Sequence, residues 1–242
     1  MIRGLYQGAK AHIHALKFLF NPSIIFYLIL SGFLSLVVFG LIGTGIYFFG
    51  DDLGANLISF LPFNALPSFL RIGAEWFTRI VLWIVSILIF KHIILIIASP
   101  LLSTISEKVE EKITGDVINM PTTAMASISR GIRLSSSHIV KELMITAVLL
   151  VLSFIPGAAI VTTPLIFIVQ AYYAGAGNLD FFMERRYNLN ESKLFFKRHR
   201  GIAIANGALF LGLLIIPIVG VFLAPTWATI SATIAALDTS KL

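Results

Sequence analysis

Two shortages in the sequence exclude whole classes of protein. There is no cysteine, so disulfide bonds, thiolate nucleophiles and cysteine metal sites are all ruled out. Only 12% of the 242 residues are charged, whereas a soluble domain carries about 25%. Hydrophobic residues make up 57% of the chain. A composition with so little polar surface favours a protein that lies in a lipid bilayer.

Three long stretches contain no Asp, Glu, Lys or Arg. They are residues 18–50, 143–179 and 201–237. About 20 apolar residues are enough for a helix to cross the hydrocarbon core of a bilayer. A surface helix of a soluble protein needs a polar face, which stretches of this kind lack. The fold class that we expect is therefore an all-α integral membrane protein.

The sequence also lacks the motifs of catalysis and cofactor binding. Its five histidines show no metal-ligand spacing; they are His12, His14, His92, His138 and His199. It has no Ser-His-Asp ordering and no Walker motif. We therefore expect a protein that is not an enzyme and that holds no metal or cofactor.

The formal net charge of +6 is better explained by cytoplasmic loops facing anionic lipid than by binding to nucleic acid.

The first half of the chain is predicted to hold two long spans, within a single membrane domain over residues 1–242. Residues 1–20 carry apolar side chains at helical spacing and basic ones on the other face, which predicts an amphipathic helix at the membrane interface. Residues 21–50 form the first span, and residues 51–73 form a connection on the non-cytoplasmic side. A helix over 74–115 would be about 60 Å long, twice the hydrocarbon thickness, so its end must project into the cytoplasm.

The second half is predicted to hold two helical hairpins, at 143–179 and 201–237, which follow cytoplasmic segments at 116–142 and 180–200. Each hairpin is broken near its middle, which leaves arms of ~13 to 15 residues that reach about 20 Å against a core of about 30 Å. We therefore expect partly penetrating hairpins, with ordinary hairpins of minimum length as the alternative. The residues predicted at the tips are Pro156, Gly157, Pro164, Pro217, Gly220 and Pro225.

The distribution of positive charge predicts the topology. Of the 18 Lys and Arg residues, 15 fall in segments 1–20, 107–142, 180–200 and 238–242. If both hairpins return to their starting side, all four segments share one side of the membrane. The positive-inside rule makes that side the cytoplasm. We expect a multi-pass protein of the bacterial inner (plasma) membrane with both termini cytoplasmic.

Residues 98–110 read Ala-Ser-Pro-Leu-Leu-Ser-Thr-Ile-Ser-Glu-Lys-Val-Glu and resemble the CysZ-type sulfate permease family, also called the etoposide-induced-protein family. That family has an Ala-x-Pro and then a Glu-x-x-Glu at the end of a long helix. Further matches are Ile155-Pro156-Gly157, Asp180, and the Phe-Phe-Lys-Arg-His-Arg of residues 195–200. The resemblance implies two full spans, two partly penetrating hairpins and passage of sulfate into the cytoplasm for cysteine synthesis.

One departure from the family pattern leaves a second function open. The family often has a Gly-Leu-Arg type anion-binding motif just after the proline that opens the first span. Here Pro22 is followed by Ser-Ile-Ile-Phe, without arginine. The alternative is therefore a non-transporting membrane scaffold or assembly factor of the same fold. The other partners that we expect are the lipid bilayer and a small inorganic anion such as sulfate, with a homo-oligomer left open.

A sulfate ion carries two negative charges, so its site must supply several donors. The stretch Arg-Gly-Ile-Arg-Leu-Ser-Ser-Ser-His provides Arg130, Arg133, Ser135 and His138. Lys91 adds a charge in the second span, where it costs roughly 2.5 to 3.5 kcal/mol and must face protein or water. These five residues are the predicted anion site. The alternatives are a solvated loop that orients the protein and a lysine that snorkels or loses its charge.

A second basic cluster lies further along the chain. It comprises Arg185, Arg186, Lys197, Arg198 and Arg200. Positive charge beside an apolar hairpin is what the positive-inside rule requires. We interpret this cluster as an orientation signal.

Overall fold

The computed structural model describes residues 1–59, 89–116, 123–153, 155, 157–216 and 218–240, with side chains described outside 49–59 and 240. Within these residues helices are the only regular elements. The helices are α1 (Ile2–Leu19), α2 (Pro22–Ser59), α4 (Ser99–Thr114), α5 (Ala124–Ser153), α6 (Ala159–Met183), α7 (Leu189–Arg198), α8 (Arg200–Leu214) and α9 (Val219–Ser240). A further helical segment, Ile89–Ile97, precedes α4. The all-α prediction is confirmed.

Among the described residues, four helices are long and apolar enough to cross a membrane. They are Pro22–Phe48 within α2, Ala124–Ser153, Ala159–Met183 and Val219–Thr239. In α9 78% of the apolar stretch is buried, against 33%, 28% and 39% in the other three. The first three therefore present wide apolar faces outward, as lipid requires, while α9 lies in the centre of the bundle.

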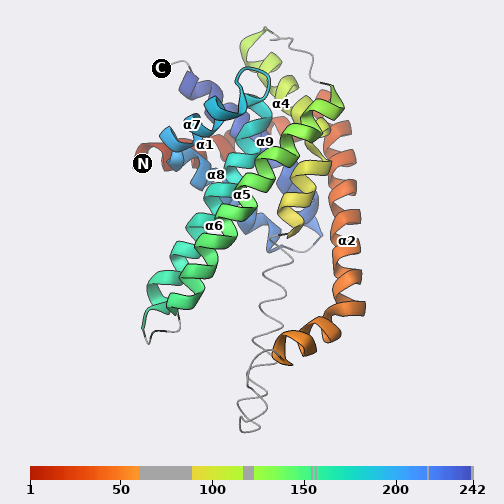
Figure 1. Ribbon diagram of the computed structural model, residues 1–242. Helices are drawn as coiled ribbons and strands as arrows, with labels where there is room; N and C mark the ends of the chain where they lie inside the picture. The colour runs from red at the N-terminus through yellow and green to blue at the C-terminus, as the bar shows by residue number, and fades with distance from the viewer. Residues whose placement is uncertain (60–88, 117–122, 154, 156, 217, 241–242) are drawn as a thin grey trace.

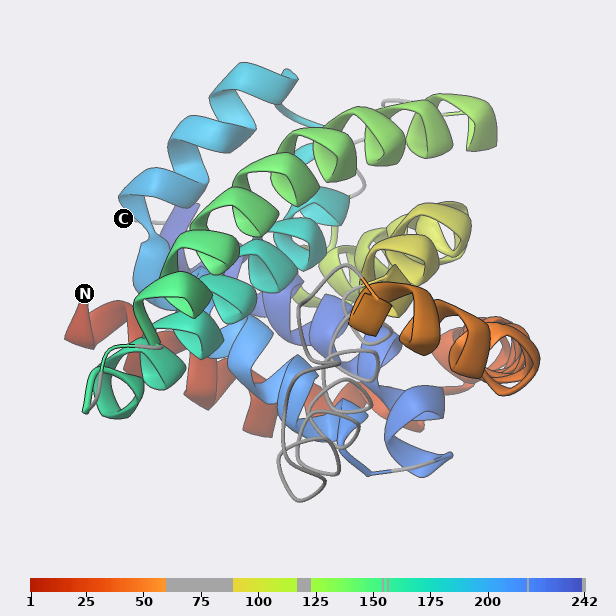
Figure 2. The ribbon, with the colours of Figure 1, turned by 60° about the horizontal axis from the view of Figure 1, so that its bottom comes forward.

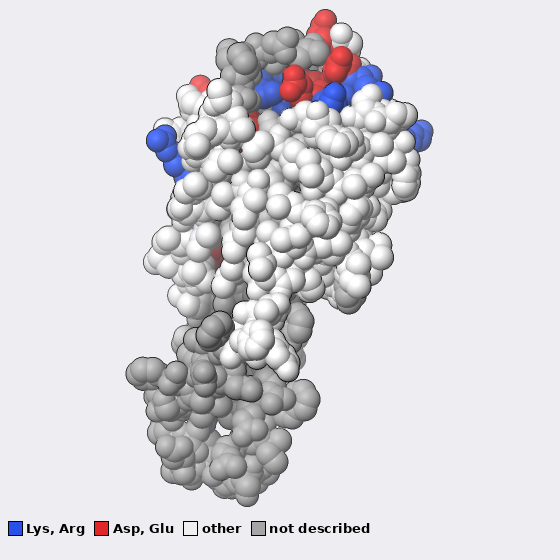
Figure 3. Space-filling model, turned by 90° about the vertical axis from the view of Figure 1, so that its right-hand side faces the viewer, with Lys and Arg blue, Asp and Glu red and all other residues white. Residues whose placement is uncertain are grey.

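The helices pack around α9, which contacts α1, α2, α4, α6 and α8. Figure 1 shows α5 and α6 side by side as a long pair, with α2 along the opposite edge. In Figure 2 α8 lies between α6 and α1, in agreement with its contacts to both helices. Charged side chains gather at the upper end of the face in Figure 3, and the body below them is almost free of charge. This separation is typical of a membrane protein, whose charged groups remain outside the hydrocarbon core.

The second spanning segment is not the single straight helix that its length predicted. Its described part, Ile89–Ile97 and Ser99–Thr114, bends by 68°. Pro100 lies in the first turn of α4, where its missing N–H costs nothing. Its ring would clash with the Ile96 carbonyl in a continuous helix, and that carbonyl instead accepts a hydrogen bond of 2.8 Å from the Ser99 hydroxyl. Residues 74–88 lie outside the described residues.

Two other expected boundaries differ from the helix ends. The first span was expected to end at residue 50, but α2 continues to Ser59 and so enters the predicted connection. The predicted segments 116–142 and 143–179 meet inside a helix, because α5 begins at Ala124 and runs to Ser153. Helix α5 is therefore polar in its first half and apolar in its second. The change of composition near residue 142 therefore lies inside one continuous helix and does not mark the end of an element.

The first hairpin has longer arms than expected. Its helices α5 and α6 contain 30 and 25 residues, which correspond to about 45 and 37 Å at helical rise. The reversal between them includes Gly157, whose φ of 82° is a conformation that glycine adopts at little cost. The second hairpin is shorter, because α8 has 15 residues and reaches about 22 Å. Both helices are longer than the predicted arms because each continues beyond the uncharged run 143–179, α5 at its start and α6 at its end.

The predicted tip residues do not all lie at the tips. Pro164 is inside α6, and Pro225 is inside α9. Gly220 is the second residue of α9, next to the reversal. Pro156 and Pro217 lie outside the described residues. The prolines nearer the C-terminus of each pair therefore belong to helices.

Helices α6 and α8 approach each other closely because glycines face one another across the contact. A Cβ atom at Gly175 would be 1.8 Å from the Ala203 carbonyl oxygen, and one at Gly207 would be 1.8 Å from that of Ala171. Small residues at such positions let helix backbones touch in a membrane. This contact fixes the positions of the two helices that form one side of the candidate site.

Candidate functional site

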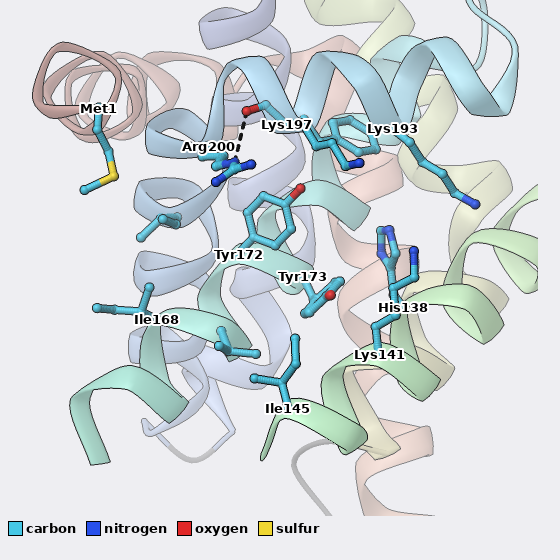
Figure 4. Close-up of a pocket in the computed structure, with 13 residues that line it drawn as sticks. Met1, His138, Lys141, Ile145, Ile168, Tyr172, Tyr173, Lys193, Lys197 and Arg200 are labelled. Carbon is cyan, nitrogen blue, oxygen red and sulfur yellow. Dashed lines mark hydrogen bonds between the residues drawn. The ribbon is translucent and has the colours of Figure 1, made fainter. Parts of the chain in front are cut away.

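An open hollow of about 570 Å³ lies between α5, α6, α7 and α8 (Figure 4). Four of the residues that line it are basic, and among its described lining residues there is no Asp or Glu. The basic residues are Lys141, Lys193, Lys197 and Arg200, and the other polar ones include His138, Tyr172 and Tyr173. We call this site the basic hollow. Its excess of positive charge makes it the best candidate for an anion-binding site.

Local structure directs three of the four cations toward the basic hollow. Helix α7 begins with a capping box, in which Asn188 and Glu191 each bind the other's backbone N–H. Lys193 and Lys197 are four residues apart on this helix and therefore share a face. Arg200 opens α8 and donates from Nε to the Lys197 carbonyl oxygen at 3.1 Å, the dashed line in Figure 4.

The wall opposite α7 adds polar groups that carry no fixed charge. The His138 ring is 5.1 Å from the Tyr173 ring, measured between centroids, and Tyr172 packs edge-on against Tyr173 at 5.2 Å. Lys193 Nζ donates to Ser137 Oγ at 3.3 Å. Imidazole and phenol groups can donate hydrogen bonds to an oxyanion. The basic hollow therefore combines positive charge with neutral donors.

None of the four cations forms an ion pair with another described residue. A concave surface with charge of one sign concentrates oppositely charged ions, because the low-dielectric walls focus the electric field. Hydrogen bonds between an ionised donor and an anion are about twice as strong as neutral ones. The geometry is therefore suited to attract and bind a small oxyanion.

The structure gives Lys91 a different environment from the predicted one. Its ammonium group is fully buried and donates to the Glu142 carboxylate and, at 2.6 Å, to Gln170 Oε1. His92 Nε2 is 3.1 Å from the second oxygen of Glu142, and Gln170 Nε2 donates to Thr146 Oγ1 at 3.2 Å. Lys91 thus has a buried counter-charge. Glu142 is not predicted from the sequence as a partner of Lys91, because it falls in the predicted cytoplasmic segment 116–142.

Arg130 is engaged in a two-pronged ion pair with Asp180. Its Nε and Nη2 atoms are 2.9 and 2.7 Å from the two carboxylate oxygens. Its remaining donors reach the Tyr187 carbonyl and Ser192 Oγ, each at 2.7 Å. The guanidinium group therefore fastens α5 to the end of α6 and to α7. It lies outside the basic hollow.

The other residues of the predicted anion site are dispersed. His138 lines the basic hollow, whereas Arg133 is exposed on α5. Ser135 lines a separate space of about 20 Å³ beside Asp180 and Glu184. Burial is the main cause that raises the pKa of Glu184 to about 7, and the nearby charge of Asp180 acts in the same direction.

The second basic cluster of the sequence is divided among three places, and Arg198 lines a separate space with Glu191 and His199. Arg185 and Arg186 both bind the Glu110 carboxylate, the former at 2.8 Å between Nη2 and Oε2. Lys197 and Arg200 belong to the basic hollow. The signal that could have separated them was the four-residue spacing of Lys193 and Lys197 in a helix beside Arg200. Lys141 gave no such signal, because its nearness to α7 depends on the fold.

Comparison with known proteins gives a family match. The model of the family described as sulfate transporter CysZ/etoposide-induced protein 2.4 matches residues 11–225. The match includes all four cations of the basic hollow and the Glu110 that binds two arginines. No curated protein matches the sequence.

Proposed function

Since the chain belongs to the sulfate transporter CysZ/etoposide-induced protein 2.4 family, we propose that it passes sulfate or a related small oxyanion through the membrane into the cytoplasm. The observation that carries the proposal is the basic hollow, whose described lining contains four cations and no carboxylate. The proposal includes the orientation predicted from charge, with both termini and the basic hollow on the cytoplasmic side.

The position of the cations suits the first or last step of passage. A dianion that leaves water needs compensating charge nearby, because an uncompensated ion in a low-dielectric medium costs several kcal/mol. The basic hollow supplies this charge at the end of the bundle where the charged residues gather (Figure 3). His138 lies one helical turn before Glu142 on α5, which places the neutralised Lys91–Glu142 pair next along that helix.

In this proposal the residues predicted from the sequence have different tasks. His138, with its neighbours in the basic hollow, contacts the anion. Lys91 and Arg130 position the helices, because each is held by a carboxylate. Arg133, which is exposed, contributes to the positive field around the entrance.

One observation favours the alternative, a non-transporting scaffold. Four basic residues are bound to carboxylates inside the protein, which is what a rigid body requires; they are Lys91, Arg130, Arg185 and Arg186. A scaffold function does not explain, however, why four further cations and no carboxylate occur in the described lining of one space. We therefore rank transport first.

Uptake of radiolabelled sulfate by proteoliposomes containing the purified chain tests the proposal. We expect uptake above that of empty vesicles, and a loss of about tenfold or more in the triple variant Lys193→Gln, Lys197→Gln, Arg200→Gln, because each hydrogen bond to a charged group contributes about 1.5–3 kcal/mol. The matched control removes three exposed cations of α1, through Arg3→Gln, Lys10→Gln and Lys17→Gln. If the parent takes up no sulfate, or if both variants transport like the parent, the proposal fails.

A further inference from the structure

The boundary between polar and apolar surface runs through the basic hollow. On each of three helices a polar lining residue lies one helical turn from an isoleucine on the same face. The pairs are Lys141 and Ile145 on α5, Tyr172 and Ile168 on α6, and Arg200 and Ile204 on α8. In Figure 4 the cations Lys193, Lys197 and Arg200 lie above the tyrosines, with Ile145 and Ile168 below them. The hollow therefore has a charged half and an apolar half.

The apolar half is continuous with the outer surface of the α5–α6 pair. Ile145 and Ile168 are 40% and 42% exposed. Further exposed apolar residues continue each of these faces at helical spacing. They are Val148 and Leu152 on α5, and Leu165 and Val161 on α6. Both helices are apolar and long enough to cross a membrane. The hollow thus opens toward the surface that faces lipid.

We propose that the basic hollow binds an anionic phospholipid, with the phosphate among the cations and one acyl chain along the isoleucine wall. A free sulfate ion uses the cations and leaves the apolar half without a partner. A phospholipid satisfies both halves, since basic pockets between membrane helices suit lipid phosphate groups. The lipid would compete with sulfate for Lys193, Lys197 and Arg200, and this competition rests on the proposed function.

Charge complementarity also selects the class of lipid. A zwitterionic headgroup carries an ammonium group beside its phosphate, and that group needs a carboxylate or an aromatic cage. Among its described lining residues the hollow offers no carboxylate and four cations, which repel an ammonium group. The occupant is therefore a lipid with net negative charge, such as phosphatidylglycerol.

Native mass spectrometry of the delipidated full chain tests lipid binding directly. Phosphatidylglycerol and phosphatidylcholine with identical acyl chains are titrated separately in neutral detergent. We expect phosphatidylglycerol to bind about tenfold more tightly, and the triple variant Lys193→Gln, Lys197→Gln, Arg200→Gln to lose this preference. The variant with Arg3, Lys10 and Lys17 changed to glutamine, which removes the same charge from exposed positions, keeps it.

A second variant tests the apolar half. Ile145→Asn with Ile168→Asn changes two partly exposed side chains, so neither substitution disturbs the packed interior of the protein. We expect weaker binding of phosphatidylglycerol by about fivefold or more, with binding of inorganic sulfate unchanged. Circular dichroism and gel filtration establish that each variant is folded before binding is compared.

The outcomes separate this proposal from the proposed function. Equal affinity for the two lipids, or unchanged phosphatidylglycerol affinity in the double asparagine variant, overturns the lipid site and leaves sulfate uptake untouched. Selective lipid binding by a parent protein that takes up no sulfate establishes the lipid site and removes the transport function. If sulfate at millimolar concentration fails to weaken lipid binding in a protein that transports it, the two ligands do not share the cations.

Discussion

The Lys91 ammonium group donates a hydrogen bond to the Glu142 carboxylate at a position where neither side chain reaches solvent. The pair joins the helical segment Ile89–Ile97 to α5, and Gln170 extends the connection to α6 at 2.6 Å from Lys91. These two charges compensate each other where a single one would be costly. The pair therefore determines how three helices assemble.

The first prediction is that Glu142→Gln destabilises the protein. The change leaves a buried lysine without its counter-charge, and breaking a buried ion pair in this way costs about 3–5 kcal/mol. Thermal unfolding in detergent should show a clear fall in the midpoint, and the double variant with Lys91→Met should recover most of it. The control Glu111→Gln removes an exposed carboxylate of α4. Equal midpoints for Glu142→Gln and this control would contradict the role of the pair.

The second prediction concerns the two-pronged contact of Arg130. Arg130→Lys keeps the positive charge but cannot reach Asp180, the Tyr187 carbonyl and Ser192 together, because an ammonium group lacks the planar fork of arginine. We expect faster amide hydrogen exchange over residues 187–192, where α7 begins. Arg133→Lys, an equal change at an exposed position, should leave exchange unaltered. If amide exchange over residues 187–192 is as slow in Arg130→Lys as in the parent, other contacts hold the start of α7.

The third prediction is a dependence of stability on pH through Glu184. Burial raises its pKa to about 7, with a further contribution from Asp180. The folded protein thus holds this proton more tightly than the unfolded chain. Stability should fall as the pH rises from about 4.5 to 7, by at most about 3 kcal/mol from this group, and stay level above that range.

The variant Glu184→Gln isolates this contribution. It should be more stable than the parent at pH 8 and should lose the part of the pH dependence between about 4.5 and 7. Unfolding midpoints of both proteins measured at pH 5 and pH 8 give the comparison. A variant that follows the parent at both pH values would mean that Glu184 stays charged throughout.

The fourth prediction is that Gly175→Ala separates α6 from α8. Its new Cβ atom would be 1.8 Å from the Ala203 carbonyl oxygen, so the two backbones must move apart. Forcing an extra methyl group into such a contact typically costs 1–3 kcal/mol. The control Gly212→Ala adds the same atom on α8, where nothing lies within 4 Å. If both variants unfold at the same temperature, the close contact contributes little to stability.

The class of fold could be predicted because membrane helices are encoded in single stretches of sequence. Uncharged runs, such as residues 201–237, are long enough to identify membrane segments without knowledge of their neighbours. The bend before α4 was harder to predict, since a proline such as Pro100 is compatible both with a slight kink in one span and with a large bend between two helices. The start of α5 was missed because a helix that passes from water into lipid has polar residues in its first half and gives no apolar run there.

The candidate site was mostly beyond prediction, because its residues come from four helices, of which α5 is distant in the sequence from α7 and α8. Lys141 and Lys193 are brought to the same hollow only by the packing of α5 against α6 and of α6 and α7 against α8. In the sequence Arg130 and Lys91 both look like free cations. In the fold Arg130 is paired with Asp180, and Lys91 is paired with Glu142. Counting positive charge along a chain cannot distinguish a cation that is paired in the fold from one that is available to a ligand.

The glycine contact between α6 and α8 divides the basic hollow into a fixed wall and a hinged one. Backbones in direct contact cannot slide or rotate without a clash, so Tyr172 on α6 and Arg200 on α8 keep their separation. Helix α5 is joined to α6 by a reversal at its far end and is held along its length by side chains, including Arg130 and Glu142. Any widening of the hollow must therefore occur as a movement of α5 or of α7, which Arg130 joins through Ser192. The strength of the contacts made by Arg130 and Glu142 sets how readily the hollow opens.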